Sequence, residues 1–345
     1  MIYGLPYKGS KNAIAERIIA ALPAGEHFVD CCCGGGAILQ AAAMSGKYKT
    51  VTGYDINKAI VGLIEATMIN PGTIDYEKKV LPVTKEQFYE SRDRNETLDD
   101  WLNRYIASFG YNGQEYLWGE NRIRYKTLQH QAITAPTFEE RRNAMRDLIT
   151  AICKDHPSDD DLRNLCNSEQ ATSLSRFQRV EEEIKACKNL AKMRVVVSSM
   201  FDIPFEKYDV IYFDPPYHNT KGYNRMAFSF IMFKALLRTL VETGKTVFVS
   251  EYDCPADGYT EIWSAEKMMT QKADENRKVT ERLFYGGTKE SYESLSGVTH
   301  SEDTGSDTSV HVDTDGGTGE DNPGEGLLQE VCSGIKEPVE HNGQD

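Results

Sequence analysis

The strongest constraint on the fold is an apolar run, residues 208–213, in which apolar and polar side chains do not alternate after the second position. A strand with one wet face alternates, whereas a strand covered by helices on both faces is apolar throughout. The run therefore predicts a central strand of a parallel sheet in an α/β fold. It ends at Asp214-Pro215-Pro216-Tyr217, where the prolines stop the strand and make a rigid, non-helical turn.

The first third of the chain contains an ordered series of elements suited to the same sheet. Residues 27–32 read as a strand that runs into three glycines, and residues 37–44 read as a helix. A second strand, residues 50–54, is closed by Asp55. Strand, glycine loop, helix and strand is the opening order of a Rossmann-like α/β sheet. Further helices are predicted at residues 12–22 and 229–242, and further strands at residues 193–197 and 245–250.

Composition divides the chain into three parts. Between residues 70 and 192 the periodicity is helical and polar, which predicts a helical insertion between two parts of a sheet domain, residues 1–69 and 193–285. Residues 286–345 are rich in Gly, Ser, Thr, Asp and Glu and have few aromatic residues. Such a segment buries too little apolar surface to offset its ordering entropy. We therefore expect a disordered acidic tail.

The charge of the chain is unevenly distributed. The formal net charge is -14, which taken alone argues against a nucleic-acid partner. The predicted tail, however, carries 14 acidic residues against 2 lysines, and the rest of the chain has 39 acidic and 37 basic residues. The part expected to fold is nearly neutral, so its composition does not exclude DNA.

Several classes of protein are disfavoured by the sequence. No stretch approaches the roughly 20 apolar residues of a membrane span, and the start lacks a basic segment followed by an apolar core. We expect a cytoplasmic protein with no membrane partner. Its 8 cysteines are too sparse for a disulfide scaffold, and Cys31-Cys32-Cys33 lacks zinc-ligand spacing. We interpret these three as reduced thiols at a buried strand end and predict no metal site.

The glycine loop, Gly34 to Gly36, suggests a ligand site. A glycine turn between a strand and a helix lets the backbone approach a ligand at the helix N-terminus. Asp55, at the end of the next strand, is placed to accept hydrogen bonds from both hydroxyls of a ribose. Together they suggest a cofactor that contains a nucleoside. The alternative is a tight turn followed by a carboxylate that caps a helix.

The Asp-Pro-Pro-Tyr turn suits an exocyclic amine. The Asp214 carboxylate and the Pro215 carbonyl can both accept hydrogen bonds from a nucleobase amino group and so localise its lone pair for attack on a sulfonium methyl. Tyr217 can stack on the base, which must first flip out of the duplex. The alternative is an ordinary proline turn.

In order and type, these motifs resemble those of the Dam-type (class alpha) N6-adenine-specific DNA methyltransferases, especially their bacteriophage members. The resemblance extends from Ile2 to about Tyr285. It implies a Rossmann-like S-adenosylmethionine-dependent methyltransferase sheet with an inserted helical target-recognition domain. The segments that carry it are residues 7–11, 28–36, 53–57, 201–203, 214–217, 247–253 and 277–284.

The resemblance also implies roles for individual residues. Tyr7 and Lys11 would lie near the methionine end of S-adenosylmethionine, Asp55 at its ribose and Asp202 at its adenine. Family members usually carry Phe at the position of Cys32, so we expect looser cofactor packing there. The implied cofactor site comprises Tyr7, Lys11, Asp30, Cys32, Gly34, Gly36, Asp55 and Asp202, and the implied catalytic motif comprises Asp214, Pro215, Pro216 and Tyr217.

The middle of the chain resembles the DNA-contacting part of the family more loosely. Tyr111 and Asn112 lie between glycines, and Arg122, Arg124 and Lys126 follow on a predicted helix. Polar and basic side chains of this kind read base edges or bind phosphates. The alternative is a solvated helical face.

The favoured function is transfer of a methyl group from S-adenosylmethionine to N6 of a flipped adenine in double-stranded DNA. An aryl amine needs no strong base, so positioning and charge stabilisation suffice without a metal. One alternative keeps the fold but acts on RNA adenine or on cytosine N4. Another is a DNA-binding regulator with weak or no catalysis.

Overall fold

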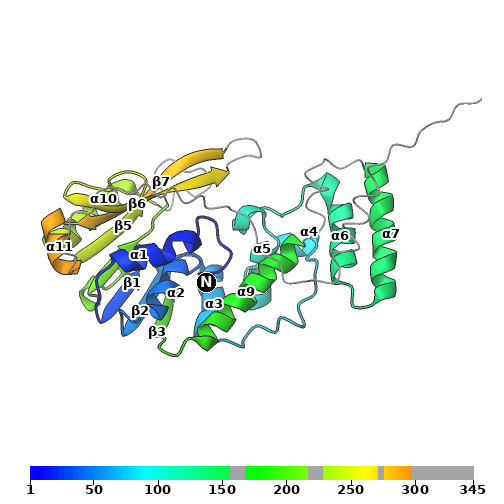
Figure 1. Cartoon of the computed structure of the whole chain (residues 1–345), viewed down its shortest axis with the longest axis horizontal. Coiled ribbons are helices and arrows are strands. Elements are labelled where there is room, and N and C mark those ends of the chain that lie inside the picture. Colours follow the sequence, from blue (N-terminus) through cyan, green and yellow to red (C-terminus); the bar gives the residue numbers. More distant parts are fainter. Residues whose placement is uncertain (156–167, 217–227, 271–275, 297–345) are drawn as a thin grey trace, which may run out of the picture. The chain divides into compact units, whose positions relative to one another are not determined.

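The computed structural model describes residues 1–155, 168–216, 228–270 and 276–296 (Figure 1). These residues divide into two compact units. The sheet unit comprises residues 1–116 and 173–296, and the helical unit comprises residues 117–155 and 168–172.

One seven-stranded sheet forms the centre of the sheet unit. Its strands are β1 (His27–Asp30), β2 (Thr50–Asp55), β3 (Lys192–Val197), β4 (Val210–Phe213), β5 (Thr246–Glu251), β6 (Tyr259–Thr270) and β7 (Asn276–Gly286). They lie in the order β3-β2-β1-β4-β5-β7-β6. Strands β1 to β5 are parallel, whereas β7 is antiparallel to β5 and β6. This mixed α/β architecture confirms the predicted Rossmann-like fold.

Each of the two units contains helices (Figure 1). In the sheet unit they are α1 (Ala15–Ala21), α2 (Ala37–Met44), α3 (Lys58–Ile64), α4 (Lys85–Arg94), α5 (Leu98–Ile106), α10 (Phe230–Glu242) and α11 (Lys289–Ser296). The helical unit contains α6 (Glu120–Thr134), α7 (Phe138–Asp155) and the start of α9 (Glu169–Ala186). Within the described ranges, none of the helices has the length and apolar character needed to cross a membrane.

Strand β4 is buried on both faces, as its unbroken apolar sequence predicts. Val210, Ile211, Tyr212 and Phe213 are each at most 2% exposed. On one face of β4, Ile211 and Phe213 pack with side chains of β1, β5 and α10 in one apolar core. The predicted strands and the helices α2 and α10 agree with the structure to within two residues at their ends. The helix predicted over residues 12–22 is a 3-10 turn, Asn12–Ile14, followed by α1.

Strand β6 was not predicted from the sequence. Its register against β7 shifts between Glu261 and Trp263, which places a bulge in the strand. A bulge interrupts the two-residue alternation of side chains between the faces of a sheet. The pattern that identifies a strand in the sequence is therefore broken here.

The predicted tail begins too early. Residues 289–296 form α11, so the prediction of disorder from residue 286 was wrong for this segment. The Tyr292 ring lies 5.8 Å from the Tyr285 ring and 6.4 Å from the Phe248 ring, measured between centroids. Its hydroxyl donates to the carbonyl of Ala21 at 2.9 Å. One aromatic residue thus anchors a polar helix, and residues 297–345 lie outside the described residues.

The structure also divides the predicted insertion, residues 70–192, in a different way. Residues 70–116 and 173–192 belong to the sheet unit. Trp101 of α5 lies against Gly62 of α3, where an added Cβ would come within 2.1 Å of the indole ring. Such close helix packing joins α5 to the sheet unit, although nothing in the polar sequence of this segment indicates it.

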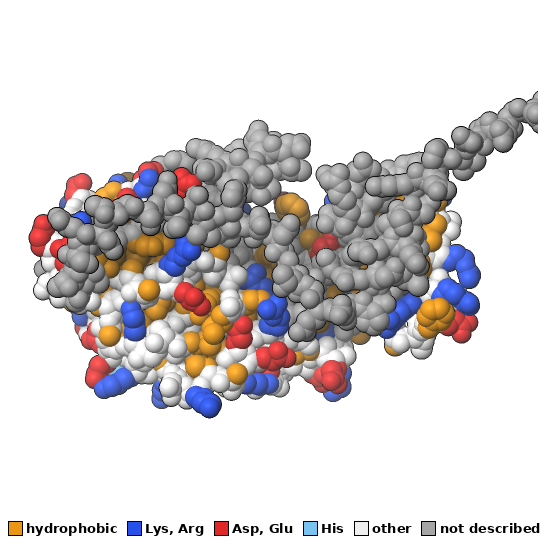
Figure 2. Space-filling view, viewed as in Figure 1, with side chains coloured by type: hydrophobic (Ala, Val, Ile, Leu, Met, Phe, Trp, Pro, Cys, Tyr) orange, Lys and Arg blue, Asp and Glu red, His pale blue; other side chains and the backbone are white. Residues whose placement is uncertain are grey.

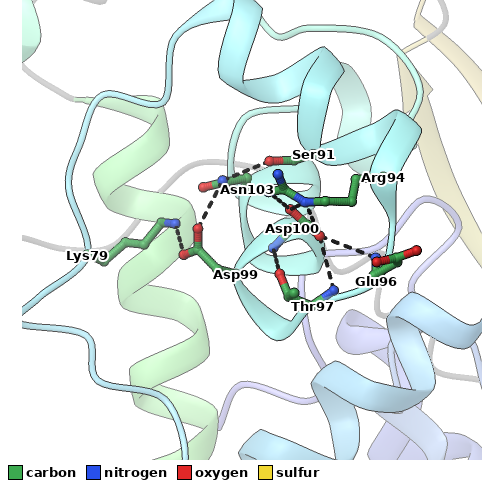
Figure 3. Close-up of polar contacts among 8 residues, drawn as sticks. All are labelled: Lys79, Ser91, Arg94, Glu96, Thr97, Asp99, Asp100 and Asn103. Atoms are coloured by element: carbon green, nitrogen blue, oxygen red, sulfur yellow. Dashed lines mark hydrogen bonds and ion pairs between the residues drawn. The ribbon is translucent and has the colours of Figure 1, made fainter.

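The corner between α4 and α5 is fixed by Asp100, which is fully buried (Figure 3). Its carboxylate accepts hydrogen bonds from the Arg94 guanidinium and from the backbone N–H groups of Glu96 and Thr97. The Thr97 hydroxyl accepts from the Asp100 N–H and caps α5. Hydrogen bonds from Arg94 hold the pKa of Asp100 well below its usual range.

Candidate active site

Three carboxylates meet at one edge of the sheet. Asp30 ends β1, Asp55 ends β2 and Asp214 directly follows β4. These strands are parallel neighbours in the order β2-β1-β4, and Asp30 is in register with Gly53 and Tyr212. Their carboxyl ends therefore lie side by side, where ligands bind in open α/β sheets. The structure brings these three predicted residues together.

Lys11 lies between two carboxylates. Its Nζ is 2.7 Å from Asp214 Oδ1 and 3.4 Å from Glu281 Oε1, and the Lys11 side chain is 6% exposed. Burial alone would lower the pKa of Lys11, but the two carboxylates outweigh burial and raise it. The ammonium is therefore charged. The resemblance placed Lys11 near the cofactor's methionine, whereas its ion pairs in the structure are with the catalytic motif and β7.

Asp30 is 1% exposed, and its Oδ1 atom has no hydrogen-bond partner among the described residues. Burial, together with the nearby charge of Asp214, raises the pKa of Asp30 well above its usual value. A buried polar atom without a partner is costly. This acceptor is thus suited to a hydrogen-bond donor from a bound ligand.

The glycine loop is held against Asp55 and Tyr7. Asp55 accepts hydrogen bonds from the backbone N–H groups of Gly34 and Asn57, at 3.0 Å and 2.8 Å. Gly34 has a φ of +47°, and an added Cβ would come within 2.8 Å of the Tyr7 ring. Gly36, with a φ of +77°, starts α2. The turn requires glycine because bulkier residues rarely adopt these angles.

The other predicted residues of the site differ in exposure. Cys32 is partly exposed, and burial raises the pKa of its thiol, so the thiol is neutral. Asp202 lies in a short 3-10 helix after β3, and its side chain is exposed. Pro215 is buried and Pro216 is partly exposed, whereas Tyr217 lies outside the described residues.

Glu281 was not predicted as a site residue. It is 1% exposed on β7 and contributes the second carboxylate beside Lys11. Residues 277–284 around it carry part of the family resemblance, with no role implied for Glu281. A signal was present, because the alternation of Val279, Glu281 and Leu283 places a charged residue in phase with a buried leucine. Such a position calls for a buried charge partner.

The loop after α5 holds two of the predicted DNA-contacting residues. Tyr111 has a φ of 55°, which is unusual for a bulky residue and is often found at functional sites. Asn112 Oδ1 accepts from the N–H groups of Gln114 and Glu115, at 2.8 Å and 3.1 Å. Part of the Asn112 amide thus stabilises the turn itself.

Three predicted DNA-contacting residues lie on α6 in the helical unit. Arg122 and Arg124 are exposed. Lys126 is 3% exposed, and its Nζ is 2.8 Å from Glu169 Oε1. A buried, paired ammonium cannot reach a phosphate without breaking its ion pair. Lys126 thus links α6 to the start of α9, and its contact with DNA stays a prediction.

Comparison with known proteins identifies a family. A family model described as "D12 class N6 adenine-specific DNA methyltransferase" matches residues 7–276. No curated protein matches the sequence. One similar solved structure is the rRNA methyltransferase aviRa from Streptomyces viridochromogenes, with 13% identity and a TM-score of 0.34 over 79% of this chain and 82% of that one. Another is the putative methylase HI0767 from Haemophilus influenzae, with 12% identity and a TM-score of 0.29 over 82% and 92%.

Proposed function

Because the chain belongs to the D12 class of N6 adenine-specific DNA methyltransferases, we propose that Asp214 and Pro215 hold the amino group of a flipped adenine in double-stranded DNA. The enzyme uses S-adenosylmethionine and modifies DNA adenine, as its family does. The observation that carries the residue assignment is the Lys11–Asp214 ion pair of 2.7 Å at the end of β4, beside Asp30 and Asp55.

The residues beside β1 and β2 suit S-adenosylmethionine. The unpartnered Asp30 Oδ1 is a buried acceptor, appropriate for the ammonium of the cofactor's methionine. Asp55 is suited to the ribose of the cofactor. The left-handed glycine turn lets the protein backbone come close to the cofactor. When bound, the cofactor supplies a methyl group carried on a positively charged sulfur. Tyr7, Cys32 and Asp202 complete the proposed cofactor site.

The residues after β4 suit the adenine. The Asp214 carboxylate and the Pro215 carbonyl accept the two amino hydrogens and hold the nitrogen with its lone pair available. The Lys11 ammonium pairs with the Oδ1 atom of Asp214 at 2.7 Å and so holds the carboxylate in place. Preorganised acceptors lower the barrier because they stabilise the positive charge that develops on the nitrogen. Tyr217 is proposed to stack on the flipped base.

We assign DNA contacts to the loop after α5 and to the exposed arginines of α6. Tyr111 and Asn112 lie in a turn with left-handed backbone angles, and the guanidinium of Arg104 donates to the carbonyl of Gly113 at 3.2 Å. A turn anchored in this way presents its side chains in a defined orientation. Arg122 and Arg124 are suited to phosphates.

The assignment is tested with the full-length protein, labelled S-adenosylmethionine and duplex DNA. The wild type should produce N6-methyladenine, and Asp214→Ala should abolish transfer while cofactor binding, measured by calorimetry, is retained. Asp93→Ala is the matched control, because Asp93 is an exposed carboxylate of α4. Label that appears only in RNA would contradict a DNA substrate.

A further inference from the structure

Glu281 is a buried carboxylate beside the proposed catalytic residues. It lies on β7, is 1% exposed, and is 3.4 Å from the Lys11 ammonium. Lys11 already pairs with Asp214 at the shorter distance of 2.7 Å. Buried glutamates are rare unless they are paired. The Lys11 ammonium pairs with two carboxylates, of which Glu281 is buried and Asp214 is partly exposed.

The cluster of Lys11, Asp214 and Glu281 differs in net charge from a simple ion pair. One lysine and two carboxylates give the three groups a formal net charge of −1. Without Glu281, the ion pair of Lys11 and Asp214 would be neutral overall. The additional negative charge therefore comes from β7, a strand far from the catalytic motif in the sequence.

We infer that Glu281 is a positioning residue that shares the Lys11 ammonium and thereby leaves negative charge on Asp214 for the amino group of the target base. This inference rests on the proposed function. During transfer, adenine N6 forms a bond to the methyl carbon, while the bond from sulfur to that carbon breaks and its electron pair stays on sulfur. N6 becomes positively charged and then releases a proton to water. A cluster with net negative charge favours the step in which that positive charge forms.

The decisive variant is Glu281→Gln, which removes the charge and keeps the shape. We expect kcat on duplex DNA to fall roughly tenfold, because a unit charge a few ångström away acts across a partly screened interior. The dissociation constant for S-adenosylmethionine, measured by calorimetry without DNA, should change by less than about twofold, because Glu281 is proposed to act through Lys11 on Asp214. Glu281→Asp should recover part of the rate.

Glu261→Gln is the matched control. Glu261 lies on the neighbouring strand β6, is 43% exposed, and pairs with Arg282 at 3.1 Å. Its loss should leave kcat within about twofold of the wild type, as is usual for exposed ion pairs. Lys11→Met provides the second test: if Glu281 acts through Lys11, adding Glu281→Gln to Lys11→Met should cause no further loss of rate.

The outcomes separate the two proposals. A Glu281→Gln protein that unfolds at lower temperature but keeps the wild-type kcat would overturn the inference, since Glu281 would then be only structural. Additive losses with Lys11→Met would also overturn it. An inactive wild type overturns the proposed function and this inference together, whereas an active wild type with an equally active Glu281→Gln overturns only the inference.

Discussion

The carboxyl edge of the parallel strands and the proposed DNA-contacting region differ in how closely they match the sequence prediction. At the sheet edge, Asp30, Asp55 and Asp214 converge as expected from strand order. In the DNA-contacting region, the predicted residues belong to two separate units, and Lys126 is buried. The difference shows that strand ends are placed by topology, whereas the direction of a side chain on a helix depends on its packing.

The distribution of charged side chains on the surface also bears on the proposed DNA contacts. On the face shown in Figure 2, acidic and basic side chains are interspersed over the described surface of the sheet unit. The distribution of charge therefore marks no DNA-binding region on the described surface of the sheet unit in this view. The proposed DNA contacts depend on particular arginines, which makes them easier to contradict by mutation than the catalytic edge.

The largest effect is expected from Lys11→Met, which tests the sheet edge. Removal of the ammonium takes away the cation that pairs with both Asp214 and Glu281, so repulsion between the two carboxylates increases. We expect kcat to fall about 100-fold, because the amino group loses an ionised acceptor or meets a distorted one. Methyl transfer to duplex DNA under single-turnover conditions measures this.

The control for Lys11→Met is Lys49→Met. Lys49 is 71% exposed and pairs with Glu26 on the surface. Its rate should stay within about twofold of the wild type. Equal rates for both variants would remove Lys11 from the catalytic assignment.

A smaller effect is expected in the DNA-contacting region. The double variant Arg122→Ala and Arg124→Ala should weaken DNA binding about tenfold and flatten its logarithmic salt dependence by about 2, since each phosphate contact contributes nearly one unit. Lys126→Met should leave that slope unchanged and lower thermal stability, because it removes the buried ion pair of Lys126 with Glu169. Binding titrations at several salt concentrations measure the slope. A flatter slope for Lys126→Met, with an unchanged slope for the arginine double variant, would place Lys126 at the DNA interface and remove the two arginines from it.

The smallest effect concerns the stability of the protein without cofactor. Burial raises the pKa of Asp30, so the folded protein keeps a proton that the unfolded chain releases from about pH 4 upward. The stability that protonated Asp30 contributes is fully present below its pKa in the unfolded chain. It is lost as the pH rises toward its higher pKa in the folded protein. Asp30→Asn removes this loss and should raise the melting temperature relative to the wild type by about 2–4 °C more at pH 8 than at pH 5. Asp93→Asn is the exposed control, and a difference independent of pH would contradict a buried, proton-holding Asp30.

Much of the fold could be predicted because its signals are local. The apolar run at β4, the glycine turn before α2 and the acid at the end of β2 each lie within a few residues. Strand β6 was missed because its bulge breaks the alternation of side chains. Helix α11 was missed because its polar composition resembles a disordered segment, although Tyr292 packs on aromatic residues of the sheet.

The sequence by itself determined the α/β class, the order of the motifs and the chemistry of an amine-holding turn, because these depend on residue type and short spacing. Only the tertiary structure decided that Lys11 lies between Asp214 and Glu281, and that Lys126 faces Glu169. Lys11 and Asp214 are 203 positions apart in the chain. Contacts across such distances depend on how strands and helices pack, and no local pattern in the sequence encodes which distant charges will meet.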